Sequence, residues 1–460
     1  IYGSKAAGGV ILIQTKKAKA GKAKVEYGGS VTAKFVGLQP ELMTLDQWCN
    51  AVTQARLNDG YKPEDDTWLQ YAALAQANKG HYIDLDNTVN PFNNAFTDVA
   101  DFVFFDTDWQ NILWGTAMST SHELSVSGGG EKTTYRLSGR YMYDDSNLKW
   151  GNNNNQRYNL RLNNTFHVTD KFDIESVLSF FRQDQVAPTQ VGSALTASTQ
   201  QPGFPSSTTD GKPYAWGTWG APNWYCELGG DNKLVVTTMN VNEILKVNIL
   251  DGLDFQGTLG YSTNNAARDE QYLSIDWYQY DGTPIQNENS PYPAKEKSSY
   301  TKSSARTDNY TASAFLTYKK LFDEVHDISL MGGVQYDYAA YDYSGTKAMD
   351  VEAAIESLNG KGQIYIDKVD RWEEAILSYF GRLNYNYKSR YMVEVNARYD
   401  GSSKFLPKNR WNFFWGASAG WRITEEKFME NLRDYVNELK LRASYGEVGN
   451  QNGIGRYDGI

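Results

Sequence analysis

Paired acidic residues are the part of this chain that comes nearest to a catalytic pattern. Asp65-Asp66 and Glu373-Glu374 could supply the two carboxylates that flank a scissile bond in glycoside hydrolysis. Adjacent residues of a strand point to opposite faces, however, so the two members of a pair do not converge on one substrate atom. We therefore expect a protein that is not an enzyme.

The histidines and acidic residues also lack the spacing of a metal site. The chain contains four histidines, none of them at metal-ligand spacing: His81, His122, His167 and His326. The run that begins at Asp84 resembles the start of a calcium-binding loop, but Val89 and Ala95 occupy the sixth and twelfth positions, where such a loop needs Gly and Glu. We expect no metal ion and no other cofactor.

Two cysteines, Cys49 and Cys226, are too few for a disulfide framework or a structural metal site. Cys49 lies in residues 42–57, where apolar residues at helical spacing predict a short amphipathic helix. A buried thiol is therefore expected there, with a bridge between the two cysteines as the alternative.

The densest group of aromatic residues lies in one predicted loop. Its members are Tyr214, Trp216, Trp219, Trp224 and Tyr225. Exposed indole faces stack on sugar rings or on partner proteins. We predict that this group contacts a ligand or a lid protein, and the alternative is packing against neighbouring loops.

Composition excludes several classes of protein. The 460 residues include 45 Lys and Arg against 55 Asp and Glu, and the net charge of −10 argues against a nucleic-acid surface. No run of 18 apolar residues occurs, which excludes a helical transmembrane protein. Aromatic residues reach 14%, an excess that aromatic girdles at a membrane interface would explain.

Hydrophobic alternation predicts an all-β chain. From Lys24 to Phe35, apolar residues such as Val25 and Tyr27 alternate with polar ones. The same pattern predicts thirteen strands near residues 24–35, 119–127, 133–143, 156–168, 172–182, 234–248, 253–262, 307–319, 326–338, 376–387, 391–400, 411–422 and 439–446. Most have about ten residues or slightly more, the length that a tilted strand needs to cross a bilayer.

Short and long connections alternate between these strands. Five short turns are predicted at residues 128–132, 169–171, 249–252, 320–325 and 388–390. The long connections lie at residues 36–118, 144–155, 183–233, 263–306, 339–375 and 401–410. In an antiparallel sheet this alternation places all tight turns on one rim and all long loops on the other, the pattern of a transmembrane β-barrel with short periplasmic turns and long extracellular loops. The exception is 423–438, on the short rim, where an amphipathic helix is predicted.

The polar faces of the strands favour a barrel over a soluble β-sandwich. Large charged residues lie on the face opposite the apolar one: Arg136, Arg140, Arg157 and Arg161. A sandwich core would bury these charges without partners, whereas the lumen of a barrel keeps them hydrated. Tyrosines at strand ends are predicted to form the interfacial girdles: Tyr141, Tyr143, Tyr385 and Tyr387.

The first 17 residues contain a compact motif. Its positions are Tyr2, Gly3, Gly8, Gly9, Val10 and Thr15. The motif resembles the end of the plug domain of TonB-dependent outer-membrane transporters, particularly the SusC/RagA branch, although Gly8 stands where the SusC-type motif usually has Asn. Residues 107–110 with 122–129, and 439–446 with 449–452, are similar to recurrent SusC-type barrel segments.

The resemblance implies how the chain is organised. Residues 1–22 would end a plug domain, and residues 23–460 would form the first part of a transmembrane antiparallel β-barrel. Transporters of this type close with about 22 strands, so thirteen strands imply a fragment, with about nine more strands after Ile460.

The resemblance also implies a function. It is the TonB-dependent import of oligosaccharides or peptides across the outer membrane of a Gram-negative, Bacteroidetes-like cell. A SusD-like surface lipoprotein would capture the ligand, and TonB would act through a segment outside this chain. The alternatives are a siderophore-type or passive outer-membrane channel, or a secreted soluble β-protein that binds or cleaves carbohydrate.

Overall fold

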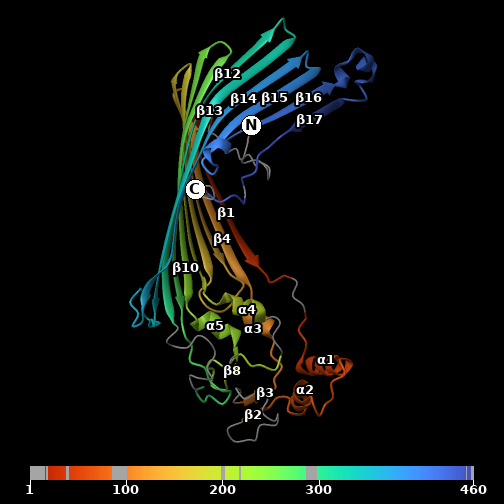
Figure 1. The fold of residues 1–460 in the computed structure, drawn as a ribbon, viewed down its shortest axis with the longest axis vertical. Helices are drawn as coiled ribbons and strands as arrows, with labels where there is room; N and C mark the ends of the chain where they lie inside the picture. Colours follow the sequence, from red (N-terminus) through yellow and green to blue (C-terminus); the bar gives the residue numbers. More distant parts are fainter. Residues whose placement is uncertain are drawn as a thin grey trace.

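The computed structural model describes residue 16 and residues 19–37, 41–84, 101–197, 202–216, 219–285, 298–451 and 453–456. Within these residues, thirteen strands form one antiparallel sheet whose order follows the chain (Figure 1). They are β1 (Gly21–Lys34), β4 (Ala117–Gly129), β5 (Thr133–Asp145), β6 (Asn154–Thr169), β7 (Phe172–Pro188), β10 (Asp231–Leu250), β11 (Leu253–Tyr272), β12 (Ser299–Phe322), β13 (His326–Met349), β14 (Ile364–Tyr387), β15 (Tyr391–Ser402), β16 (Trp411–Arg422) and β17 (Lys440–Gly446). The predicted all-β class and partial barrel are confirmed, with β1 and β17 as the edges of the sheet.

The register keeps apolar residues together on one face of the sheet. Leu160 of β6 lies opposite Gly139 of β5 and Phe180 of β7, and its exposed fraction is 51%. Its neighbour Asn159 lies on the other face, opposite Arg140. One face therefore carries an apolar band while the other carries polar side chains, the pattern expected of a transmembrane barrel.

Aromatic rings lie at both ends of the apolar band. Tyr141 and Tyr158 contact each other near the long connections, with ring centroids 5.1 Å apart. At the opposite end, Tyr387 stacks on Tyr391 at 6.4 Å. Amphipathic rings are favoured at the two interfaces of a bilayer, so these positions match girdles.

Several strands are longer than predicted. β10 and β11 have 20 residues each, and β12, β13 and β14 have 24. Their additional residues continue beyond the apolar band towards the long connections. In β14 the first eight residues are exposed to solvent, so no buried face imposes an alternation that sequence analysis could detect.

The short turns lie together at the upper rim in Figure 1, and the long connections that lead into β4, β6, β10, β12 and β14 gather at the lower rim. Two short turns contain consecutive residues in the left-handed region: Asp323 and Glu324 with φ of 48° and 58°, and Lys388 and Ser389 with φ of 50° and 56°. Two such residues in a row give a turn whose twist matches that of the flanking strands. These turns therefore hold the hairpins in register.

The long connections fold into further elements, which we call the loop cap. Its helices are α1 (Leu45–Asn58), α2 (Thr67–Ala77), α3 (Trp109–Leu113), α4 (Val191–Ala197) and α5 (Pro222–Leu228), and its short strands are β2 (Tyr82–Asp84), β3 (Asp101–Val103), β8 (Ala215–Trp216) and β9 (Trp219–Gly220). A 3₁₀ helix, η4 (Pro407–Asn409), lies in the connection between β15 and β16. The predicted helix near Cys49 is present as α1, while α2 was not predicted. No helix in the described part of the chain is long and apolar enough to cross a membrane.

The prediction of an amphipathic helix for residues 423–438 is wrong. The connection instead contains two 3₁₀ helices, η5 (Ile423–Glu425) and η6 (Lys427–Leu432). Between them Glu426 has an extended backbone, with φ of −76° and ψ of 149°. Its carboxylate is held by Tyr391 and Trp421 of the sheet, and this tertiary contact outweighs the local helical pattern.

Candidate functional site

The polar face of the sheet carries charged side chains that find partners on neighbouring strands. Arg136 donates from Nη2 to Ser125 Oγ at 3.0 Å, and its Nη1 lies 3.5 Å from Glu26 Oε2. Arg140 donates from Nε to Ser121 Oγ at 2.9 Å. Neighbours on the same face therefore satisfy these guanidinium groups, as expected for the wall of a polar lumen.

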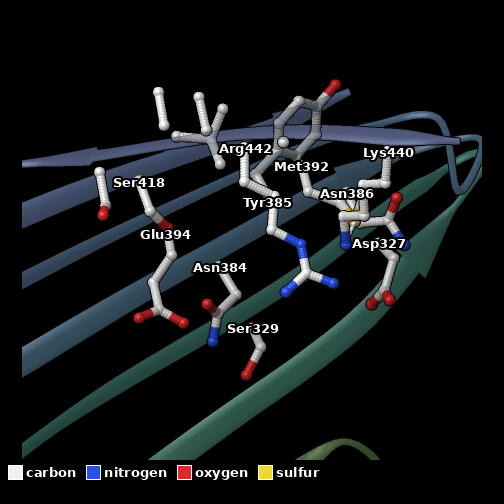
Figure 2. Close-up of a pocket in the computed structure, with 15 residues that line it drawn as sticks. Asp327, Ser329, Asn384, Tyr385, Asn386, Met392, Glu394, Ser418, Lys440 and Arg442 are labelled. Atoms are coloured by element: carbon white, nitrogen blue, oxygen red, sulfur yellow. Dashed lines mark hydrogen bonds between the residues drawn. The ribbon is translucent and has the colours of Figure 1, made fainter. Parts of the chain in front are cut away.

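A hollow of about 470 Å³ lies on this polar face, over β13 to β17 and close to the short turns. Figure 2 shows Asp327, Asn384, Glu394 and Arg442 on one side of the strands, and the ring of Tyr385 on the other. The two faces are separated here as they are along β6. Two acidic groups, a guanidinium and an amide thus line one polar wall.

Hydrogen bonds along the wall fix some of these groups. Asn396 Nδ2 donates to Glu394 Oε1 at 2.8 Å, and Arg382 Nε donates to Asn396 Oδ1 at 2.8 Å. Lys440 Nζ lies 3.1 Å from Met392 Sδ. Such a wall can hydrogen-bond polar groups of a ligand or of another part of the polypeptide. Among the described residues, no group of His, Cys, Asp and Glu side chains could hold a metal ion.

The structure buries the five predicted aromatic residues to different extents: Tyr214 is buried, Trp216, Trp224 and Tyr225 are half-buried, and Trp219 is exposed. Tyr214 is fully buried, at 1% exposure, whereas Trp219 is 59% exposed. Trp216 packs against Tyr71 and against Phe204 at 4.9 Å between ring centroids. Four of the five residues pack within the loop cap, and Trp219 is the one that offers a large free surface.

Trp224 and Tyr225 also pack against other parts of the loop cap. Trp224 lies 5.6 Å from Trp150 between ring centroids, and its Nε1 donates to Ser206 O at 2.7 Å. Tyr225 lies 5.0 Å from Trp277. Trp150 and Trp277 belong to other connections, so these contacts join separate loops into one unit.

A buried carboxylate also links three of the long connections. Asp101 is 2% exposed, and it accepts a hydrogen bond from Tyr214 Oη at 3.1 Å and from Tyr280 N at 2.6 Å. Burial first, and then the Asp101 charge, raise the pKa of the Tyr214 hydroxyl well above its ordinary value. The Tyr214 hydroxyl therefore stays protonated and continues to donate its hydrogen bond to Asp101.

Sequence reasoning missed Asp101, Trp150 and Trp277. Each lies more than 50 residues from its partner in the aromatic loop. No local spacing relates residues at that separation, so tertiary packing alone brings them together.

Both cysteines are free and buried in the loop cap. Cys49 packs with Leu45, Tyr71 and Phe104, whereas Cys226 belongs to a different cluster around Trp109. Burial raises the pKa of each thiol to about 11. The structure therefore has buried thiols instead of a bridge.

The predicted plug motif lies outside the described residues, at Tyr2, Gly3, Gly8, Gly9, Val10 and Thr15. Just after it, the carbonyl of Lys16 accepts a hydrogen bond from Asn163 Nδ2 at 3.0 Å. Asn163 lies on the polar face of β6, opposite Arg136. The end of the N-terminal segment thus touches the inner wall.

Comparison with known proteins identifies relatives along the whole chain. TonB-dependent receptor P3 of Formosa agariphila is 26% identical over 473 residues, covering 98% of this chain and 40% of that receptor. TonB-dependent receptor SusC of Bacteroides thetaiotaomicron is 27% identical over 471 residues, covering 98% and 42%. The chain thus spans about two fifths of the length of these curated relatives.

Solved structures share the fold. The RagAB peptide transporter superimposes with a TM-score of 0.75 at 21% identity, over 99% of this chain and 50% of that chain. The family model described as TonB dependent receptor-like, beta-barrel matches residues 207–459, more than half of the chain. This is a family of receptors and transporters, not of enzymes. The chain therefore belongs to the TonB-dependent receptor-like β-barrel family, whose members are outer-membrane proteins.

Proposed function

We propose that the full-length protein imports oligosaccharides or peptides across the outer membrane in a TonB-dependent manner. The observation that carries this proposal is the chain-wide similarity to SusC, together with the fold shared with RagAB, which is itself a peptide importer. The polar wall supports it, because a large hydrophilic ligand needs hydrogen-bonding groups along its route.

The proposal assigns parts of the chain to partners. Residues 1–22 would end the plug domain, and residues 23–460 would form barrel wall and loop cap. A SusD-like lipoprotein would sit over the cap and hand the ligand to the barrel, while TonB would act through a segment outside this chain. Transport needs no bond in the ligand to be broken.

Within the loop cap, we propose that Trp219 contacts the ligand or the lipoprotein. Its exposed indole is available for stacking. The other four aromatic residues of the group, Tyr214, Trp216, Trp224 and Tyr225, would fix the position of this loop by packing.

The decisive experiment compares growth of strains that lack the full-length gene or TonB. Both deletions should abolish growth on the cognate oligosaccharide or peptide mixture, while growth on the matching monosaccharides or amino acids stays normal. Normal growth of the TonB deletion on the polymer would favour a passive channel. A defect confined to iron-limited medium would favour the siderophore-type alternative.

A further inference from the structure

One connection on the short-turn rim differs from the others that the structure describes. The strand bounds leave two or three residues between β4 and β5, β6 and β7, β10 and β11, β12 and β13, and β14 and β15, whereas residues 423–439 separate β16 from β17. We call residues 423–439 the rim segment. Figure 1 shows it at the upper right, beyond the ends of β16 and β17. A hairpin does not need so long a connection.

The rim segment is attached to the lipid-facing side of the sheet. Glu426 Oε1 accepts hydrogen bonds from Tyr391 Oη at 2.6 Å and from Trp421 Nε1 at 3.0 Å. Tyr391 and Trp421 are cross-strand partners, and both share the face of Val393 and Val395, which belongs to the apolar band. Arg390 Nη1 donates to the second carboxylate oxygen of Glu426 at 3.0 Å. The carboxylate therefore clamps the segment to the aromatic girdle.

The rim segment exposes large apolar side chains next to that girdle. Phe428 is 66% exposed, Leu432 48% and Tyr435 86%, while Met429 is buried at 8%. The hydrogen bond from Arg433 Nε to Thr424 O, at 2.8 Å, closes the segment on itself. Two aromatic rings and a leucine are thus exposed on a folded segment that is bound to residues of the girdle, and bilayer interfaces favour such side chains.

The charges of the segment indicate how it would meet a membrane. Five carboxylates, Glu425, Glu426, Glu430, Asp434 and Glu438, outnumber Lys427 and Arg433. An acidic segment is repelled by anionic lipid, so contact must come from apolar insertion into a zwitterionic surface.

We propose that the rim segment is an interfacial membrane anchor. Phe428, Leu432 and Tyr435 enter the head-group region of the periplasmic leaflet, and Glu426 holds the segment against the barrel wall. The occupant of this surface is phospholipid, because Glu426 fastens the segment to Tyr391 and Trp421 on the lipid-facing side of the sheet. The anchor acts on the barrel itself and does not depend on which ligand is imported.

Site-directed fluorescence in the full-length protein tests the anchor. Phe428→Cys is labelled with an environment-sensitive fluorophore and reconstituted in phosphatidylcholine and phosphatidylethanolamine vesicles that contain a lipid with a shallow nitroxide. Cys49 and Cys226 are 0% and 1% exposed, and the unsubstituted protein reports any remaining background. Asp170→Cys, in the two-residue turn between β6 and β7 on the same rim, is the matched control.

We expect quenching at position 428 at least threefold stronger than at position 170, and unchanged by 0.5 M salt. Equal quenching at both positions would overturn the proposal and leave the segment as a water-facing surface for a periplasmic protein. Tyr435→Cys provides a second label position with the same expectation.

Adding Glu426→Ala to Phe428→Cys tests the clamp. Quenching at position 428 should fall to the control level, while the heat-modifiable gel mobility of the folded barrel is retained. Undiminished quenching in a folded barrel would refute the role of Glu426.

Discussion

Single residues in this sheet act according to the face they occupy. Leu160 and Asn159 are adjacent in β6, yet one faces Gly139 and Phe180 in the apolar band while the other faces Arg140 on the polar wall. Because the side-chain period of a strand is two, a shift of one residue would exchange their environments. A residue of the wall is therefore stable either against lipid or against the polar lumen, but not in both environments.

Leu160→Arg should destabilise the barrel by roughly 2–4 kcal/mol, since it places a charge in the hydrocarbon region. Asn159→Arg is the matched control and should cost much less, because its side chain points to the lumen. Denaturant unfolding of the full-length protein in lipid vesicles measures both. Equal losses would mean that the two faces are assigned wrongly.

At the scale of elements, the α1–α2 hairpin shows how a loop becomes folded structure. Thr44 and Gln47 form a capping box that starts α1. Asp66 caps α2 by accepting a hydrogen bond from Leu69 N at 2.9 Å. It also accepts a hydrogen bond from Arg56 Nε of α1 at 3.2 Å. One buried carboxylate thus both begins a helix and pairs the two helices.

The hairpin should loosen in acid. The hydrogen bond from Arg56 lowers the pKa of the Asp66 carboxyl below its ordinary value of 3.8. A lowered folded-state pKa means that the stabilisation is present above the unfolded-state value and is lost as the pH falls through the folded one. Hydrogen-exchange protection of α1 and α2, corrected for intrinsic rates, should therefore fall between pH 5 and pH 2, the range expected for a carboxyl of this type.

Asp66→Asn should lower this protection at neutral pH and remove most of its pH dependence. Asp59→Asn, at the exposed end of α1, is the control and should change neither. An acid transition that persists in Asp66→Asn would assign it to another group.

In the whole molecule, the loop cap and the barrel wall have different structural roles. The wall separates lipid from a polar lumen, and the cap joins connections that are far apart in the sequence through Asp101 and the aromatic clusters. The cap is therefore a folded unit, in which most aromatic residues have structural partners and Trp219 remains available.

Two tryptophans of the cap should respond differently to substitution. Trp224→Ala removes a packed indole and its hydrogen bond to Ser206 O, and should destabilise the cap by roughly 3 kcal/mol. Trp219→Ala should leave stability almost unchanged, yet weaken ligand or lipoprotein binding about two- to tenfold, the value of one stacking contact. Limited proteolysis of the cap and titration calorimetry separate the two effects. Unchanged binding in Trp219→Ala would remove this residue from the proposed contact.

The sheet was predictable from local sequence patterns. Alternation with a period of two decides which side of each strand meets lipid, and the positions of the turns decide the order of the hairpins. Thirteen strands and their faces were therefore predictable. The burial of Cys49 in α1 was also predictable, because a helical apolar pattern is a local property.

The parts of the chain beyond the apolar band depend on contacts between distant residues. The extensions of β10 to β14 have no buried face to impose a pattern, and the rim segment gives up a helix because Glu426 bonds to Tyr391 and Trp421. The aromatic loop resembled an exposed binding site in the sequence, but its partners Trp150, Trp277 and Asp101 come from distant connections. Contacts between residues so far apart in the chain leave no periodicity to read, so only the folded cap shows that Trp219 remains exposed while its neighbours are packed.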